Sequence, residues 1–412
     1  MTGKKLLIIG FVWPEPNSSA AGSRMMQLIR LFLSKKFEII YASPAKDSVH
    51  AEDLSDYKIQ TKQISANNSE FDDYIKQLNP SHVLFDRFMM GEQFGWRIAE
   101  NCPDAIRILD TQDLHFFRKA RQRAYEQKQN FVKSSLLTDE AKREIASMYR
   151  SDLSLIISQA EMQLLIKHFK IDKKLLLYLP FLVDQKLIQK ENLPAFEERQ
   201  DFVSIGNFLH PPNFDKTKFL KEEIWPLIKE KLPEARLFIY GAYTSQKVEQ
   251  LHQPKDDFYI MGRAADAVDV IKESRVLLAP LRFGAGLKGK FIDGMRAGTP
   301  AITTIIGAEG ICGDLPWCGE IANEPQLIAE QAVKLYTNKK RWTLAQKNGF
   351  QILEKRFKAS TFKSIFFKRL NKLEKELSQN RQENFVGQML MHHSHQSTKY
   401  MSRWIEEKNK KK

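Results

Sequence analysis

Four residues between Leu281 and Pro300 have the types and the spacing of an anion-binding turn. Gly284 and Gly286 follow an apolar segment that ends at Leu281, and Lys288 and Lys290 open a predicted helix. Glycines let backbone N–H groups point at an anion, and the helix start adds the positive end of its dipole. The same dipole disfavours lysines in the first turn by roughly 0.3–1 kcal/mol. The two lysines therefore indicate a bound diphosphate, with a solvated lysine pair as the alternative.

Asp293 follows Lys290 by three residues, one turn further along the same predicted helix. Two interpretations are open for this carboxylate. It could pair with Lys290 and have a structural role only, or it could accept hydrogen bonds from ribose hydroxyls.

The first turn of the chain argues against a nicotinamide dinucleotide site. Such a site needs Gly-x-Gly-x-x-Gly so that the backbone can approach a pyrophosphate. Here a long loop runs from Gly10 to Arg24, and its only later glycine is Gly22. The loop is either an ordinary surface loop or, as we expect, part of the lining of a cleft.

The elements that must position these residues follow one pattern twice. Short apolar runs alternate with helical stretches, are interrupted by a polar segment at 185–200, and then resume. Strand–helix alternation predicts parallel sheets covered by helices on both faces. The fold class is therefore α/β, with two Rossmann-like domains whose carboxyl strand ends face each other across a deep cleft. The predicted strands are 6–11, 38–41, 83–86, 106–109, 153–157 and 175–182, then 202–205, 236–240, 258–261, 276–281 and 301–304; helices are expected from about Ser23 and Gln159 and over 216–230 and 288–297.

Composition and charge exclude several classes of protein. The 412 residues fit two domains, and 42% apolar residues are enough for globular cores. Three cysteines (Cys102, Cys312 and Cys318) form no Cys-x-x-Cys, so neither a disulfide framework nor a zinc site is expected. His392, His393 and His395 have no cysteine or carboxylate nearby, so no metal site is predicted there either. The longest apolar run has nine residues and could not span a bilayer, and the apolar start, followed by Trp13, is interpreted as a buried strand rather than a signal peptide.

The net charge of +14 lies mostly at the end of the chain. Residues 1–190 carry +5, residues 191–338 carry −4, and residues 339–412 carry +13. The two predicted domains are nearly neutral, which argues against nucleic acid as a partner. The basic end is a candidate contact with an anionic membrane surface.

From about residue 4 to residue 370 the chain resembles the retaining glycosyltransferases of family 4, also called group 1. The order and the spacing of eight motifs carry the resemblance. They are Asp110-Thr-Gln-Asp-Leu-His-Phe-Phe-Arg118, the Gly206–Asn213 segment, Ile224-Trp-Pro226, Phe238-Ile-Tyr-Gly-Ala242, Met261-Gly-Arg263, Gly284-Ala-Gly-x-Lys-x-Lys290, Asp293-Gly-Met-Arg-Ala-Gly-Thr-Pro300 and the Thr303–Gly310 segment.

The resemblance implies a GT-B fold and transfer of a sugar, with retention and without a metal, from a nucleoside diphosphate sugar to a saccharide or lipid-linked acceptor. Asp113, His115 and Asp293 are the implied catalytic residues. The implied donor-binding residues are Gly22, Asn207, His210, Gly241, Gly262, Gly284, Ala285, Gly286, Lys288, Lys290, Asp293 and Glu309. No cofactor is expected, because the chain has no Asp-x-Asp for a divalent metal and the lysines would stabilise the leaving diphosphate.

This chain departs from the family at one position that matters for the donor sugar. Many members have a Glu-x7-Glu pair, and here Ala285 takes the first place and Asp293 the second. Glu309 is a candidate to replace the missing carboxylate. Two other functions stay open: a GT-B enzyme that acts on a sugar nucleotide without transfer, as an epimerase does, and a non-catalytic binding protein.

The predicted domains are an acceptor-side domain over 1–190, a donor-binding domain over 191–360, a crossing helix over 361–377 and a basic, flexible tail over 378–412. The helix has one apolar face, which we expect to pack back across both domains. The protein is expected in the cytoplasm, and the lysines that close the tail (Lys408, Lys410, Lys411 and Lys412) could hold it at a membrane face. A soluble, disordered tail is the alternative.

Overall fold

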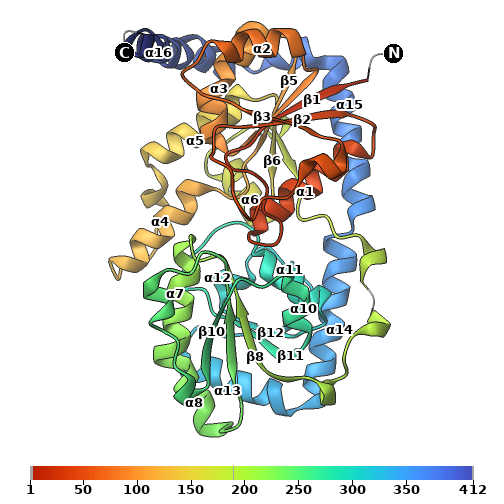
Figure 1. Cartoon of the computed structure of the whole chain (residues 1–412), viewed down its shortest axis with the longest axis vertical. Coiled ribbons are helices and arrows are strands. Elements are labelled where there is room, and N and C mark those ends of the chain that lie inside the picture. Colours follow the sequence, from red (N-terminus) through yellow and green to blue (C-terminus); the bar gives the residue numbers. More distant parts are fainter. Residues whose placement is uncertain (1–2, 189, 411–412) are drawn as a thin grey trace.

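The computed structural model describes residues 3–188 and 190–410, with the backbone alone at 187 and 393–396. The chain forms two α/β domains stacked end to end (Figure 1). Every strand pair within the two sheets is parallel, and the strand orders are β3-β2-β1-β4-β5-β6-β7 and β10-β9-β8-β11-β12-β13. The fold class predicted from the alternation of strands and helices is confirmed.

The strands are short and mostly buried on both faces, which explains their continuous apolar runs. The first sheet contains β1 (Lys5–Ile9), β2 (Glu38–Ser43), β3 (Gln60–Gln63), β4 (His82–Asp86), β5 (Ile106–Asp110), β6 (Leu153–Ile156) and β7 (Leu176–Tyr178). The second contains β8 (Gln200–Ile205), β9 (Leu237–Tyr240), β10 (Phe258–Gly262), β11 (Ser274–Ala279), β12 (Ala301–Thr303) and β13 (Gly319–Ile321). The sequence did not predict β3 and β13.

Helices cover both faces of each sheet, so each domain has two apolar layers. The helices of the first domain are α1 (Ala20–Leu33), α2 (Glu70–Leu78), α3 (Phe88–Asn101), α4 (His115–Glu126), α5 (Asp139–Arg150) and α6 (Gln159–Lys167). Those of the second are α7 (Pro211–Phe219), α8 (Trp225–Lys231), α9 (Gln246–Glu249), α10 (Ala267–Lys272), α11 (Gly289–Arg296), α12 (Ile305–Ala308) and α13 (Pro325–Thr337). The helix predicted over 216–230 is interrupted by a wide π-helical turn, Leu220–Ile224.

The chain returns to the first domain through its last helices. Helix α14 (Lys339–Arg356) packs on the second domain. After it, Lys358 forms an isolated parallel β-bridge with Val183, where the chain crosses back to the first domain. Helix α15 (Ala359–Glu383) adds Phe366, Phe367 and Leu370 to the core of the first domain. The predicted crossing helix is therefore present, and it is longer than 361–377.

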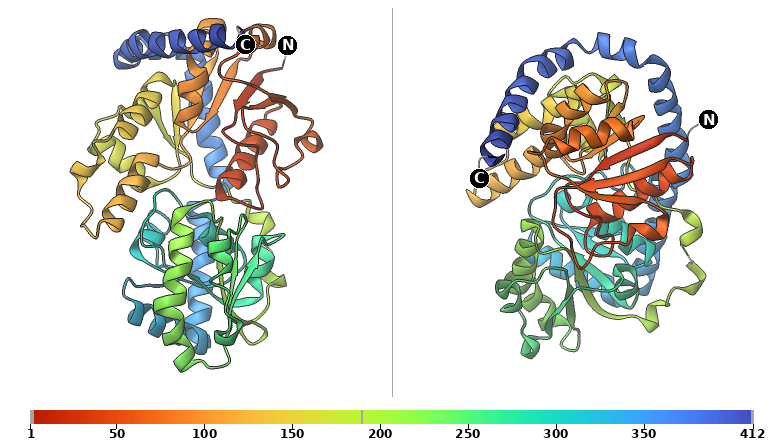
Figure 2. Two further views of the ribbon diagram at one scale, coloured as in Figure 1. Left: turned by 60° about the vertical axis from the view of Figure 1, so that its left-hand side comes forward. Right: turned by 45° about the horizontal axis from the view of Figure 1, so that its top comes forward.

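The prediction of an irregular, flexible tail after residue 378 is wrong for the described residues. Helix α15 continues to Glu383, and α16 (Phe385–Lys410) arches over the first domain (Figure 2). Polar contacts with α3, with α5 and with the loop before α2 explain this order, because they join residues about 230–340 positions apart that no local pattern reveals. Among the described helices, none is both long enough and apolar enough to span a bilayer.

Candidate functional site

Loops at the carboxyl ends of the two sheets meet at the domain interface, where the cleft is predicted. Gly286 has a φ of 64°, and a Cβ there would lie 2.7 Å from the Cβ of Asp113 in the other domain. Glycine is therefore required both by the left-handed backbone and by the close approach. The Oε1 of Glu161 accepts hydrogen bonds from the N–H groups of Leu114, at 2.9 Å, and Gly286, at 2.8 Å. One carboxylate thus joins the loops of both domains.

The predicted lysine pair lies at the start of α11, where it was expected. The Nζ of Lys288 donates to the carbonyl of Gly286 at 3.0 Å, and the Nζ of Lys290 donates to the Oδ1 of Asn213 at 2.6 Å. Among the described residues, neither has a carboxylate within 4 Å. Burial lowers the pKa of Lys288 to about 8. Burial, together with the positive charge of Lys288, lowers the pKa of Lys290 to about 7. A buried amine and a half-buried one, with no carboxylate in contact among the described residues, form a site prepared for an anion.

A third lysine, which the sequence did not single out, lies beneath this pair. Lys216 is almost fully buried, and its Nζ donates to the carbonyl of Ile205 at 3.1 Å. Burial lowers its pKa well below the usual value, and Lys290 lowers it further. The local signal was weak, because a lysine in an ordinary helix, α7, is usually solvated.

Proton uptake should accompany the binding of a diphosphate to this site. With a pKa of about 7, Lys290 is mostly neutral at pH 8 in the free protein, and Lys288 is about half charged. A bound anion favours the charged form, so it raises both pKa values and draws protons from the solvent. Affinity should be highest below pH 7 and should fall as the pH rises from 7 to 9. Titration calorimetry at pH 8 in Tris and in HEPES measures the uptake, and zero uptake or proton release would contradict this assignment.

The first domain contributes Asp113 and His115, the predicted catalytic residues, from the loop after β5 and the start of α4. The Nε2 of His115 lies 3.4 Å from Oδ1 of Asp113, and Arg118 pairs with the same carboxylate. Burial alone would raise the pKa of Asp113, but Arg118 and His115 outweigh it and lower the pKa to about 2. Burial lowers the pKa of His115 to about 3, so at neutral pH this ring is uncharged. An ionised carboxylate and a neutral imidazole therefore lie side by side.

His210 of the second domain lies close enough to Asp113 and Arg118 to interact with their charges. Burial lowers the pKa of His210 to about 4, with smaller effects from Arg118, which lowers it, and Asp113, which raises it. The structure thus brings Asp113, His115 and His210 together.

Two buried glutamates that the sequence did not predict hold the Asp113 loop in place. Glu144 of α5 accepts from the N–H groups of His115 and Phe116, at 3.2 and 3.1 Å, and so caps the start of α4. Glu161 holds Leu114 in the same way. Burial raises the pKa of Glu144 well above its usual value and that of Glu161, helped by Asp113, to about 8. Both glutamates lie inside helices, where their sequence neighbours give no sign of this role.

Glu309, a predicted donor-binding residue, forms an ion pair across the domain interface. Both of its carboxylate oxygens accept from Arg121 of the first domain at 2.7 Å, and Arg121 also donates to the carbonyl of Gly284 at 3.0 Å. Burial would raise the pKa of Glu309, but Arg121 and Lys288 lower it below its usual value. Ala285, at the position of the missing family carboxylate, packs against the apolar core of the first domain.

Asp293 does not pair with Lys290, so that structural interpretation is wrong. Its Oδ1 lies 3.3 Å from Nη1 of Arg296, and its side chain is 32% exposed. Surrounding protein atoms raise its pKa to about 6 despite Arg296. The carboxylate remains accessible to a ligand hydroxyl, as the second interpretation requires.

The other predicted donor-binding residues, Asn207 and four glycines, lie in the loops around the site. Asn207 donates from Nδ2 to the carbonyl of Ser18 at 3.1 Å, so it joins the two domains. Gly22 and Gly241 are closely packed, since a Cβ at either would lie 2.3 Å from a backbone oxygen. Gly262 has a φ of 74° and open space around it. The carbonyl of Gly284 accepts the hydrogen bond from Arg121.

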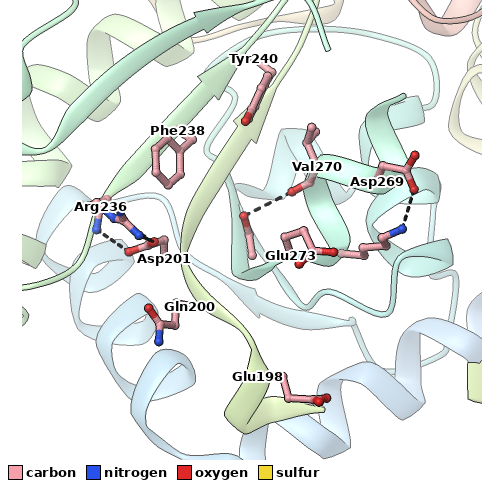
Figure 3. A pocket seen from close by; sticks show the side chains of 11 residues that line it. Glu198, Gln200, Asp201, Arg236, Phe238, Tyr240, Asp269, Val270 and Glu273 are labelled. Carbon is pink, nitrogen blue, oxygen red and sulfur yellow. Dashed lines mark hydrogen bonds and ion pairs between the residues drawn. The ribbon is translucent and has the colours of Figure 1, made fainter. Parts of the chain in front are cut away.

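One cavity of the second domain is separate from these residues. This cavity, of about 540 Å³, lies between β9 and α10. Phe238 lies beside an ion pair of Arg236 with Asp201, and Tyr240 lies further along the cavity wall (Figure 3). None of the predicted site residues lines it. Among the described residues there is also no cluster of three or more metal-binding side chains, although the side chains of His393 and His395 lie outside that description.

Comparison with known proteins supports a sugar-transfer site in the second domain. Residues 199–338 match the family model described as "Glycosyl transferases group 1". No curated protein sequence matches the chain. These matched residues include the Gly284–Lys290 turn and Asp293.

Solved structures with the same architecture cover most of the chain. A sucrose-phosphate synthase from Thermosynechococcus elongatus has a TM-score of 0.69 and 15% identity, over 90% of this chain and 99% of the other. A glycosyltransferase from Rickettsia africae has a TM-score of 0.65 and 12% identity, and the match covers 92% of this chain and 100% of the other. Anabaena HepE, solved in complex with UDP-glucose, has a TM-score of 0.65 and 13% identity, and the match covers 90% of this chain and 100% of the other. The fold is therefore GT-B.

Proposed function

We propose that this chain is a retaining glycosyltransferase of family 4, which transfers a sugar from a nucleoside diphosphate sugar to an acceptor hydroxyl. The observation that carries this proposal is the lysine pair, Lys288 and Lys290. Lys288 is buried and Lys290 is half-buried, and neither has a carboxylate within 4 Å among the described residues. Both lie within the segment that matches the group 1 family, and Lys288 lies close to Asp113 of the facing domain. Charge of this kind, fixed before the reaction, is what a departing diphosphate needs.

The donor is proposed from the site and from what related structures bind. Anabaena HepE was solved with UDP and with UDP-glucose, and a TarM variant with UDP. In this chain the lysines would hold the diphosphate and Asp293 the ribose hydroxyls. Ala285 offers no carboxylate to the donor sugar, and Glu309 is already bonded to Arg121.

The reaction exchanges one bond to the anomeric carbon for another on the same face. The bond from that carbon to the diphosphate oxygen breaks, the bond to the acceptor oxygen forms, and the proton of the acceptor hydroxyl passes to the diphosphate. No separate base is needed for this balance. His115, uncharged at neutral pH, would orient the reacting groups by hydrogen bonding, and Asp113 would hold its ring.

Transfer should continue in EDTA. The motive is that the sequence has no Asp-x-Asp and that lysines supply positive charge where the leaving group would lie. Release of nucleoside diphosphate, measured with and without EDTA, should be equal within error. Loss of activity that Mg²⁺ or Mn²⁺ restores would show that an ion neutralises the leaving group.

A non-catalytic donor-binding protein is the second candidate, because Ala285 and the bonded Glu309 leave the donor sugar without a free carboxylate at these two positions. Mass spectrometry of a saccharide acceptor incubated with donor and enzyme separates the alternatives. A mass increase of one sugar supports transfer. Donor binding without product from any acceptor favours the binding protein, and an altered free sugar nucleotide favours an epimerase-like enzyme.

We also propose that the protein contacts an anionic membrane surface, with the folded helix α16 in place of the flexible tail first considered. Apolar side chains on its outer side are 42–69% exposed, and its four basic residues, Lys399, Arg403, Lys408 and Lys410, outnumber its two glutamates. Exposed aromatic and basic side chains on one helix are typical of interfacial binding. The exposed apolar residues are Phe385, Val386, Met389, Tyr400, Met401 and Trp404.

Flotation with phosphatidylglycerol vesicles measures this contact. The wild type should float at low salt and less at 0.5 M salt, because added ions screen the attraction. Replacing Tyr400 and Trp404 by glutamate should abolish flotation. The matched control is Leu344→Glu, since Leu344 is 61% exposed but lies on α14 of the second domain. Absence of flotation at low salt, or equal flotation of all variants, would refute the membrane role.

A further inference from the structure

A second cavity lies in the first domain, outside the site described above. Its volume is about 560 Å³, within the range of cavities that bind small molecules. Helices α3 and α5 form its walls, Phe85 of β4 and Arg107 of β5 lie at its base, and Leu390 and Met391 of α16 cover it. The proposed transfer reaction uses none of these residues.

Helix α16 is fixed on both sides of this cavity. At its start, Asn384 donates from Nδ2 to the carbonyl of Tyr149 at 2.7 Å. Near its end, Lys399 and Glu406 form ion pairs with Glu100 and Arg97. The helix therefore forms a roof that is held at its ends while its middle faces an open space.

The cavity lining is strongly cationic. It contains four cations, Arg107, Lys142, Arg143 and Arg150, and one carboxylate, Glu92. Lys142 and Arg143 are paired, with Asp139 and Glu92 respectively. The cavity therefore has an excess of positive charge.

The two remaining guanidinium groups are only weakly compensated. Arg150 has no carboxylate within 4 Å among the described residues; its Nη2 donates to Ser147 Oγ at 3.1 Å. Burial lowers the pKa of Arg150. Arg107 is 9% exposed and lies 3.6 Å from Asp152, and its Nε makes no hydrogen bond in the described part of the chain.

Two glycines on one face of α3 leave room that the protein itself does not use. Gly91 and Gly95 lie one helical turn apart, and a Cβ on either would meet only Phe85, at an ordinary distance of 4.0 Å. Glycine inside a helix is destabilising relative to alanine, and neither packing nor a positive φ requires it here. The space beside these glycines is lined by Met89, Trp96, Leu390 and Met391. The cavity therefore has an apolar part, in addition to the part lined by Arg107 and Arg150.

We propose that this cavity binds a lipid with a phosphate head group, with the phosphate at Arg107 and Arg150 and the hydrocarbon chain along Gly91 and Gly95 beneath α16. Cationic groups with few counter-charges recognise the phosphate, and the apolar wall recognises the chain. The lipid is either a bilayer phospholipid or the carrier of a lipid-linked acceptor. Contacts of Arg143 with the Phe88 ring (5.3 Å) and of that ring with His115 (5.6 Å) connect the cavity to the transfer site. Only the acceptor role rests on the proposed function.

Dodecyl phosphate, used below its micelle concentration, tests the site by titration calorimetry on the full chain. The wild type should bind it at least tenfold more tightly than the uncharged dodecyl maltoside, and more tightly than inorganic phosphate. Arg150→Gln should remove the preference for the phosphate. Lys76→Gln, which removes an exposed cation from α2 of the same domain, should change nothing.

Gly95→Leu is the sharper variant, because it fills the cavity and improves helix propensity at once. It should keep or raise the melting temperature and weaken dodecyl phosphate binding at least tenfold. If it does not fold, the Gly91→Ala, Gly95→Ala double variant tests the same space, since each added Cβ fits without a clash. Equal binding of charged and uncharged amphiphiles, or undiminished binding in the filled variant that folds, would overturn the proposal.

Competition identifies the source of the lipid. Displacement of dodecyl phosphate by phosphatidylglycerol vesicles supports a bilayer phospholipid. Displacement only by phosphatidylcholine vesicles that carry a polyprenyl phosphate supports a lipid-linked acceptor. Displacement by neither refutes a lipid site. Because no sugar transfer is measured, a negative result here leaves the proposed function intact, and a failed transfer assay leaves lipid binding intact.

Discussion

Replacing both Lys288 and Lys290 with alanine should weaken the binding of a nucleoside diphosphate by about 100-fold or more. Each lysine would donate a charge-assisted hydrogen bond to the diphosphate, and losing one such bond costs about 1.5–3 kcal/mol. Each single variant should then lose roughly 10-fold to 150-fold in affinity. The two losses need not add, because Lys288 lowers the pKa of the neighbouring Lys290.

The same substitutions should leave the fold intact. In the free protein Lys288 is buried and Lys290 is half-buried, and neither has a carboxylate within 4 Å among the described residues. Removing the two amines therefore relieves a desolvation cost and breaks no ion pair. Circular dichroism and the melting temperature should match or exceed those of the wild type. Lys218→Ala is the matched control: this lysine lies on α7 of the same domain, and its side chain is 51% exposed. Wild-type affinity in the double variant would refute the diphosphate assignment.

Asp110→Ala should destabilise the first domain by about 3–5 kcal/mol, the usual cost of leaving a buried charge unpaired. Asp110 is 0% and Arg24 1% exposed, and the two form hydrogen bonds of 2.9 Å (Nε to Oδ1) and 2.7 Å (Nη2 to Oδ1). Arg24 also donates to the carbonyl of Leu179, at 2.8 Å, where the chain leaves the first sheet. The ion pair therefore joins three segments at the domain interface.

Thermal unfolding measures this effect, which corresponds to roughly 6–20 °C for a domain of this size. The control is the double variant Arg24→Met, Asp110→Leu, because replacing a buried ion pair by apolar side chains of similar volume is often neutral. The double variant should recover most of the lost stability. The part not recovered is the hydrogen bond that Arg24 donates to the carbonyl of Leu179. A single variant Asp110→Ala that melts like the wild type would contradict the account of this ion pair.

The elements with strong local patterns could be predicted from the sequence. Buried parallel strands such as β1 and β5 are continuous apolar runs, so both domains were expected. The lysine pair was found because cations at a helix start conflict with the helix dipole. Strand β3, in contrast, is Gln-Thr-Lys-Gln with all four residues exposed, so no apolar pattern marks it.

The contacts that complete the site could not be predicted, because they join segments that are distant in the sequence. Glu161 bonds Leu114 and Gly286, which lie 47 and 125 positions away, and Arg121 bonds Glu309 at a separation of 188. A buried carboxylate inside a helix has no local signature. Helix α16 was missed for the same reason, since its polar anchors, such as Glu406 with Arg97, are 309 residues apart.

A thermal-shift screen against UDP-, GDP- and ADP-sugars tests most directly whether the second domain binds an activated sugar through the lysine pair. At a concentration of 100 times the dissociation constant, a bound donor should stabilise the protein by about 2.7 kcal/mol. The account predicts a clear rise in melting temperature with one class of nucleoside diphosphate sugar, and no rise with the same compound in the Lys288→Ala, Lys290→Ala variant. No shift with any sugar nucleotide, or an equal shift in that variant, would contradict it.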